Sequence, residues 1–255
     1  MLKFKDFKYE RPDLDSIGKE ISGLIDEFNN SQDVEAQNEV ISKVNKIRSY
    51  VETMVSLVHI RHSIDTTDDF YAQEQDFMDE NSPLYEKMIM EFYKALVESK
   101  FRPQLEEKWG KQFFRLAELS LKTFSPEIMD DLVKENKLVT EYGKLLASAK
   151  IEFKGEIRNL SQMRPFMESK DRQTRKEAHE AYVGFFKENE EEFDRIYDEL
   201  VRVRDTMAKK LGYENYIPFG YARLGRTDYD AEMVANYRRQ VYEDLVPLVV
   251  KLMDR

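Results

Sequence analysis

The chain has three histidines, and their spacing limits the metal chemistry that they could perform. His59 and His62 stand at i and i+3 in the sequence HIRH, so one helix face could present both imidazoles. Protein zinc sites need three or four ligands, and Arg61 adds a positive charge that disfavours a cation. We therefore expect His59 and His62 to be ordinary helix residues.

The segment HEAYV, which begins at His179, is one residue short of a zinc-peptidase motif. In H-E-x-x-H, two histidines one helical turn apart bind zinc, and the glutamate activates the bound water. Val183 occupies the place of the second histidine. His179 and Glu180 are therefore expected on the surface of a helix, and the sequence predicts no metal ligand and no catalytic residue in this chain.

Paired acids offer acid–base or calcium chemistry in principle, but their positions favour a structural role. Asp68-Asp69, Asp130-Asp131 and Glu190–Glu192 fall at predicted helix starts or on solvated faces, where negative charge is favourable. The sequence contains no EF-hand spacing, no P-loop, no G-x-G-x-x-G and no G-x-S-x-G elbow.

A β-hairpin is predicted over about residues 150–160, where KIEFKGEIRNL alternates apolar and charged residues around Lys154-Gly155. A lone hairpin is marginal in water, so it must pack on helices or pair with other strands. Its edge could accept an extended peptide as an added strand. Alternatively, the hairpin only joins two helices, and both interpretations stand at this point.

The remaining elements are predicted to be helices, because apolar residues recur at i, i+3 and i+4. An extended arm, residues 1–12, precedes them. Two serine–proline pairs, Ser82-Pro83 and Ser125-Pro126, are typical of helix starts. Gly212 is expected to end a helix, and Pro247 to kink the last one. The predicted helices cover about residues 13–28, 33–63, 84–99, 109–121, 126–149, 171–187, 190–211 and 230 onward.

The segment KKLGYENYIPFGYARLGRTDYD, residues 209–230, holds four tyrosines and two arginines. It is interpreted as a helix end at Gly212, a tyrosine-rich connection and a new helix near Asp230. Its aromatic side chains are expected to pack between helices rather than to do chemistry.

Composition sets the fold class and excludes several partners. The 255 residues are 41% hydrophobic and 35% charged, with only 9 glycines and 7 prolines, which favours long helices. We predict a mainly α fold, an elongated multi-helix array with one small hairpin. The net charge of −10 argues against nucleic acid and anionic membranes as partners. The absence of cysteine, of a signal peptide and of a spanning segment favours a soluble, cytoplasmic protein.

The end of the sequence, LVPLVVKLMDR, shows an apolar helical stripe without a helix-stop signal. Either this helix frays in solvent, or the chain is the first part of a longer one; the unfinished stripe favours the second interpretation.

Four long segments carry a distinctive pattern: HIRHSIDTTDDFYAQEQDFMDENSP, EYGKLLASAKIEFKGEIRNLSQMRPFMESKDRQTRKEAHEAYVGFF, FDRIYDELVRVRDTMAKKLGYENYIPFGYARLGRTDYD and YRRQVYEDLVPLVVKL. In residues, order and spacing they resemble the oligoendopeptidase F (Pz-peptidase) branch of the thimet-oligopeptidase-like zinc metallopeptidases. The resemblance covers effectively the whole chain.

This resemblance implies a larger helical fold around an internal channel that admits short peptides, with the hairpin in a small sheet beside the active site. It implies zinc in the intact parent enzyme, held by an H-E-x-x-H helix and a glutamate on a following helix. Neither element is in this sequence, so we expect no zinc on this chain and no activity from it alone. Residues 1–120 would be an N-terminal helical region, and residues 121–255 the start of the peptidase domain.

The resemblance also implies partners for this chain. We expect short peptides and a missing C-terminal catalytic half, and self-association if part of the apolar stripe Val234–Leu252 stays uncovered. Peptide contacts are expected at the hairpin edge and at four side chains, each of which could instead serve packing or a surface ion pair: Phe153, Arg158, Tyr221 and Arg226. The alternative is a self-contained helical module that binds peptides or proteins without enzymatic activity.

Overall fold

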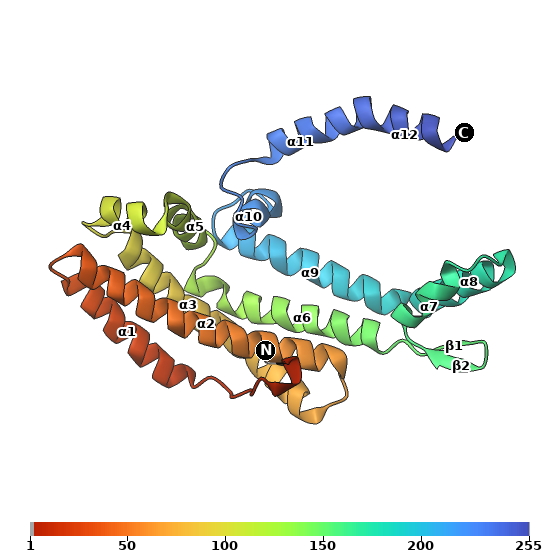
Figure 1. The fold of residues 1–255 in the computed structure, drawn as a ribbon, viewed down its shortest axis with the longest axis horizontal. Coiled ribbons are helices and arrows are strands. Elements are labelled where there is room, and N and C mark those ends of the chain that lie inside the picture. The colour runs from red at the N-terminus through yellow and green to blue at the C-terminus, as the bar shows by residue number, and fades with distance from the viewer. Residues whose placement is uncertain (1–2, 255) are drawn as a thin grey trace.

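The structure is a computed structural model that describes residues 3–254, and helices make up most of it (Figure 1). One two-stranded antiparallel hairpin is the sheet found in this range. The mainly α prediction is therefore confirmed. The α-helices are α1 (Leu14–Asn30), α2 (Val34–Ile64), α3 (Asp69–Val97), α4 (Arg102–Trp109), α5 (Lys111–Leu121), α6 (Met129–Ala147), α7 (Leu160–Met167), α8 (Arg172–Glu188), α9 (Glu190–Lys210), α10 (Tyr216–Arg223), α11 (Ala231–Gln240) and α12 (Val246–Met253).

Helices α1, α2 and α3 lie side by side and enclose the largest apolar core. Helix α1 shows why they form: Asp13 caps it by accepting a hydrogen bond from the Ser16 amide, and apolar residues at helical spacing face α2 and α3. Phe28 and Phe92 meet in this core with their ring centroids 6.0 Å apart. Both are fully buried, and each is worth roughly 1.5–3 kcal/mol of burial.

The predicted helix start at Ser82-Pro83 is wrong, because α3 runs through both residues without a break. Pro83 has no N–H, so the carbonyl of Asp79 one turn earlier loses its usual helical partner. Asn136 of α6 replaces it by donating its Nδ2–H to that carbonyl at 3.1 Å. A contact from another helix therefore lets the proline stay inside α3, which no local sequence signal reveals.

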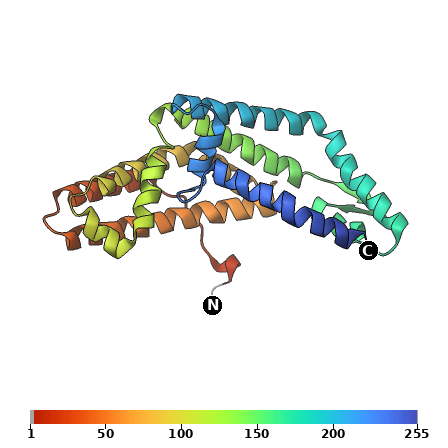
Figure 2. The ribbon, with the colours of Figure 1, turned by 90° about the horizontal axis from the view of Figure 1, so that it is seen from above.

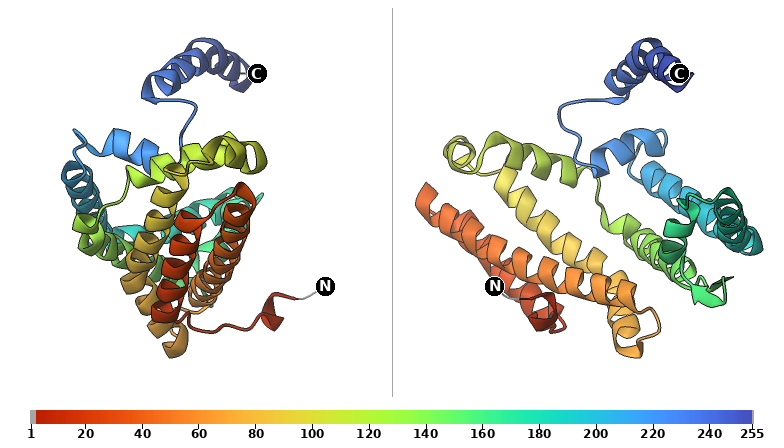
Figure 3. Two further views of the ribbon diagram at one scale, coloured as in Figure 1. Left: turned by 90° about the vertical axis from the view of Figure 1, so that its left-hand side faces the viewer. Right: turned by 45° about the vertical axis from the view of Figure 1, so that its right-hand side comes forward.

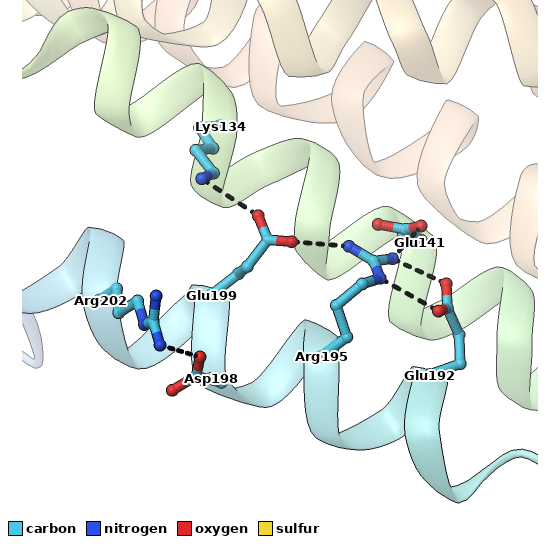
Figure 4. Close-up of polar contacts among 7 residues, drawn as sticks. All are labelled: Lys134, Glu141, Glu192, Arg195, Asp198, Glu199 and Arg202. Atoms are coloured by element: carbon cyan, nitrogen blue, oxygen red, sulfur yellow. Dashed lines mark hydrogen bonds and ion pairs between the residues drawn. The ribbon is translucent and has the colours of Figure 1, made fainter.

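Helices α6 and α9 pack along one another and form a second layer, joined by a charged network (Figure 4). Arg195 on α9 contacts Glu141 on α6 at 2.5 Å, and it also pairs with Glu192 and Glu199 on its own helix. Lys134 on α6 closes the network at 3.1 Å from Glu199. The side chains are partly exposed, so the network orients the two helices more than it stabilises them.

The hairpin, β1 (Ile151–Phe153) and β2 (Glu156–Arg158), lies beside α7 and α8 at one end of the molecule. Lys154 and Gly155 both take positive φ, 53° and 79°, as a two-residue type I′ turn requires. Ile151 and Phe153 pack with Met163 and Phe185 in a small core of their own. The predicted hairpin is confirmed, and helices cover one face of it.

Helix ends in the second half follow their local signals, with one correction. Gly212 has φ 81° and ends the helix before it, as predicted. The tyrosine-rich connection, however, contains a short helix, α10, which Asn215 caps by accepting from the Ile217 amide. Phe219 of α10 is fully buried against α6 and α9, so tertiary packing stabilises a segment with weak helical periodicity.

The chain from Ala231 to Met253 forms one arched helix, α11 and α12 joined by a π-helical turn at Val241–Leu245. The turn ends at Leu245, two residues before Pro247, and the helix arches over this region as expected (Figure 1). This helix stands apart from the body of the molecule in Figures 1 and 3, and in the view from above it crosses in front of the body (Figure 2). None of its residues is buried. No helix in residues 3–254 combines the length and apolarity needed to cross a membrane.

Candidate functional site

The hairpin has one face on the helices and one face in solvent. The register pairs Ile151 with Arg158 and Phe153 with Glu156, so these four side chains share a face. Ile157 lies on the other face and is 70% exposed. The hairpin is therefore held by one face, and neither of its edges pairs with a further strand in residues 3–254.

Phe153 and Arg158 are brought together by the hairpin. The Phe153 ring is buried 5.2 Å from the Phe166 ring, and the Arg158 guanidinium lies 4.5 Å over the same Phe166 ring. Arg158 also forms an ion pair with Glu156 at 2.9 Å. Because the Phe153 ring faces the core, this residue offers a ligand its main chain rather than its side chain.

The edge of β1 opens onto a groove of about 340 Å³ between this strand and α8. The main chain of Glu152 belongs to a non-hydrogen-bonded pair, so its N–H and C=O point away from β2 toward that edge. Gly184 on α8 adds no side chain to the groove, and Glu180 and Glu188 give it acidic walls. This geometry can accept an extended main chain, preferably one with basic side chains.

Tyr221 and Arg226 form a second cluster, at the end of α10. The Arg226 guanidinium lies 4.1 Å over the Tyr221 ring and 5.5 Å over that of Tyr229. The Arg226 amide also donates to the Tyr221 carbonyl at 3.2 Å. The guanidinium lies against both aromatic rings, and its N–H groups can donate to a carboxylate or a carbonyl.

The two clusters lie at opposite ends of α9, so they do not form one compact site (Figure 1). A helix of 21 residues is about 30 Å long. An extended peptide would need about nine residues to span that distance.

A buried carboxylate fixes α10 to the second layer. Glu135 on α6 accepts from Arg204 of α9 at 2.6 Å and from Arg223 of α10 at 3.0 Å. Burial acts to raise the pKa of Glu135, but the hydrogen bonds and charges of the two arginines outweigh it and hold that pKa below its ordinary value. For Glu86, by contrast, burial dominates and raises the pKa. No local sequence signal reveals this network, because Arg204 and Arg223 lie 69 and 88 residues from Glu135.

The histidines do not form a metal site. His59 and His179 are exposed on different helices, whereas His62 is buried. No group of three histidine, aspartate or glutamate side chains in residues 3–254 is arranged to hold a metal ion. The residues present therefore do not fit zinc, and no chemical step is assigned to them.

The arched helix adds an open apolar surface. Leu248, Val250 and Leu252 are each at least 50% exposed, and Met253 is 81% exposed. The expectation that part of the Val234–Leu252 stripe is uncovered agrees with this exposure. The exposed large apolar side chains of this region are concentrated between Leu245 and Met253.

Known proteins with this arrangement are helical peptidases. A family model for the peptidase M3 N-terminal domain matches residues 4–124. A structure of PZ peptidase A with inhibitor 2 is 52% identical and superposes with a TM-score of 0.96 over 99% of this chain. A Bacillus anthracis protein provisionally described as oligoendopeptidase F is also 52% identical, with a TM-score of 0.95 over 99% of this chain. The search of curated proteins gave no match.

The chain therefore belongs to the oligoendopeptidase F family of M3 peptidases. It spans 45% of the PZ peptidase A chain and 46% of the Bacillus anthracis chain. Peptidases of the M3 family are generally zinc metalloproteases.

Proposed function

We propose that this chain is the non-catalytic N-terminal portion of a zinc-dependent oligoendopeptidase that hydrolyses short peptides in an internal channel. The observation that carries the proposal is the match at 52% identity over 99% of this chain, which covers only 45% of PZ peptidase A. In this proposal, residues outside this chain hold the zinc and perform the hydrolysis.

The chain's own contribution is to bind and orient the peptide. An extended substrate adds to the β1 edge at Glu152, where main-chain groups are free and the groove walls are acidic. Side chains of Arg158 at one end of α9 and of Tyr221 and Arg226 at the other contact longer peptides. The side chain of Phe153 does not contact the peptide; it packs in the small core and holds β1 in place.

The arched helix, α11 and α12, is the surface on which the catalytic portion docks. Its apolar residues have no cover in residues 3–254, and the relatives contain more than twice the length of this chain. Covering such a surface removes the free-energy cost of apolar exposure, about 25 cal/mol per Å².

Fragment complementation tests this function. The chain is mixed with the part of PZ peptidase A that it does not match, and hydrolysis of a quenched fluorescent peptide is measured. We expect neither fragment to be active alone, and the mixture to show activity that EDTA abolishes and zinc restores. EDTA-sensitive hydrolysis by the 255-residue chain alone would contradict the proposal.

The matched control separates docking from peptide binding. Leu252→Asp in α12 should prevent complementation, because it places a charge in the docking surface. Arg164 is an exposed residue of α7 that pairs with Glu168. The variant Arg164→Ala should leave complementation unchanged. Arg226→Ala should preserve assembly and raise KM for peptides of about nine residues more than for pentapeptides.

A further inference from the structure

The linker, residues 225–230, connects α10 to the arched helix (Figure 1). Within residues 3–254, no hydrogen bond or ion pair joins residues 231–254 to helices α1–α10, and no residue of the arched helix is buried. A free linker of this length would let the helix point in many directions. The direction of the arched helix therefore depends on how the linker is held.

The linker begins with a fixed end of α10. Gly225 has φ 67°, and its amide donates to the Ala222 carbonyl at 3.0 Å. The Arg226 amide donates to the Tyr221 carbonyl at 3.2 Å, which completes a Schellman motif. The backbone also runs close to α5, because a Cβ added at Gly225 would lie 3.3 Å from the Leu116 Cδ2 atom. These contacts fix the direction in which the chain leaves α10.

One face of α5 holds the middle of the linker. Gln112 donates its Nε2–H to the Thr227 hydroxyl oxygen at 2.9 Å. The Thr227 hydroxyl in turn donates to the Asp228 carboxylate at 2.9 Å, and Arg115 lies 3.7 Å from that carboxylate. Gln112, Arg115 and Leu116 stand at i, i+3 and i+4, so they share one helix face. This face is called the α5 seat.

A second set of contacts joins the linker to α10 and to α11. The Arg226 guanidinium lies 4.1 Å from the Tyr221 ring centroid and 5.5 Å from that of Tyr229. The two tyrosine rings meet edge to face, with their centroids 6.5 Å apart. Asp230 then caps α11 by accepting from the Met233 amide at 2.9 Å. Each linker residue thus has a contact with α5, α10, α11 or its neighbour in the linker.

We propose that the α5 seat orients the arched helix, so that its apolar side chains are presented in the direction in which the catalytic portion docks. The identity of that partner rests on the proposed function, whereas the orientation is a property of this chain. Gln112 and Arg115 are positioning residues, since both are exposed and neither belongs to the peptide groove or to the apolar surface. Holding the surface in its docking orientation in advance lowers the entropy cost of association.

Distances between spin labels measure this orientation, because the chain has no cysteine that would compete for the label. Arg202→Cys on α9 and Lys251→Cys on α12 place labels at two exposed sites. The parent chain should give one narrow distance distribution by double electron–electron resonance. The double variant Gln112→Ala/Arg115→Ala should broaden it about twofold or more, because the linker is released from α5. A second pair, Glu20→Cys with Arg202→Cys, should keep its width and show that the body is intact.

Matched variants assign the effect to the α5 seat. Lys111→Ala also removes one positive charge from α5, but its side chain takes part in no hydrogen bond or ion pair within residues 3–254, so the width should not change. Thr227→Val removes the hydroxyl that Gln112 contacts and should broaden the distribution, whereas Thr227→Ser keeps it and should not. A parent distribution as broad as that of the double variant, or equal broadening by Lys111→Ala, would overturn the proposal.

Fragment complementation then measures the consequence for docking. The double variant should assemble severalfold more slowly than the parent chain and reach the same final activity, because only the orientation before docking has changed. Equal assembly rates would contradict a role of the α5 seat in docking. Failure of the parent chain to complement would instead contradict the proposed function, since the label distances are measured on this chain alone.

Discussion

Two regions of the molecule, the α1–α3 layer and the arched α11–α12 helix, use apolar residues in opposite ways. Helix α1 is mostly polar, LDSIGKEISGLIDEFNN, yet it buries four residues in a continuous core. Helix α12, VPLVVKLM, is mostly apolar and buries none. The comparison shows that helix composition does not decide burial: the presence of a complementary surface does.

The difference assigns a separate role to each region. The α1–α3 layer is stabilised by its own contacts, among them the edge-to-face pair of Phe28 and Phe92. Helix α12 has the composition of a buried helix and the exposure of a surface one. In our account, the first region is a scaffold and the second is an interface.

The largest expected difference comes from the same substitution made in each region. Leu96→Ala in α3, where Leu96 is fully buried, should lower the free energy of unfolding by about 2–5 kcal/mol through cavity formation. Leu252→Ala in α12, where Leu252 is 57% exposed, should change it by less than about 0.5 kcal/mol. Urea denaturation monitored by circular dichroism measures both. If the two variants lost comparable amounts of unfolding free energy, the proposed difference between the two regions would be contradicted.

A smaller effect is expected from the buried charge that fixes α10 to α6. Glu135→Gln should cost about 2–3 kcal/mol at pH 7, because it leaves Arg204 and Arg223 without their carboxylate. Glu86→Gln should cost little or stabilise the fold at pH 7, because burial disfavours the charged form of Glu86. Thermal unfolding compares the two variants with the parent chain.

Glu135 and Glu86 should change the free energy of unfolding in opposite directions as the pH falls. The pKa of Glu135 is lowered in the fold, so its contribution is present above the ordinary value of 4.5 and is lost as the pH falls below it. The pKa of Glu86 is raised, so its contribution appears as the pH falls toward 4.5 and is lost as the pH rises through the folded pKa. Glu135→Gln should therefore flatten the acid-induced loss of stability, and Glu86→Gln should steepen it. Identical pH profiles would contradict this assignment.

The smallest effect is expected in the exposed network of Figure 4. Arg195→Met removes the contacts with Glu141, Glu192 and Glu199, all of them partly exposed. Its effect should be smaller than that of Glu135→Gln, and 1 M NaCl should abolish most of it by screening. A salt-independent loss would show that the methylene groups of Arg195, and not its charge, hold α9 on α6.

Features with local causes could be predicted from the sequence. The helix starts near residues 13 and 230, the stop at Gly212 and the Lys154-Gly155 turn depend only on neighbouring residues, and all are observed. The aromatic content of residues 209–230 also indicated packing, and Phe219 is buried as that interpretation requires.

Features with distant causes could not be predicted in this way. Pro83 remains inside α3 because Asn136, 57 residues away from Asp79, satisfies the freed carbonyl. The pairing of Glu135 with Arg204 and Arg223, and the placement of Phe153–Arg158 and Tyr221–Arg226 at opposite ends of α9, likewise depend on the folded arrangement. The four predicted peptide contacts therefore remain proposals.

Hydrogen exchange of the amides in Ala231–Met253 tests the central claim most directly. In the isolated chain, we expect these amides to exchange much faster than those of α3, because the helix has no tertiary cover. Addition of the complementary part of PZ peptidase A should slow them severalfold or more. Protection equal to that of α3 in a chain shown to be monomeric by sedimentation would contradict the account.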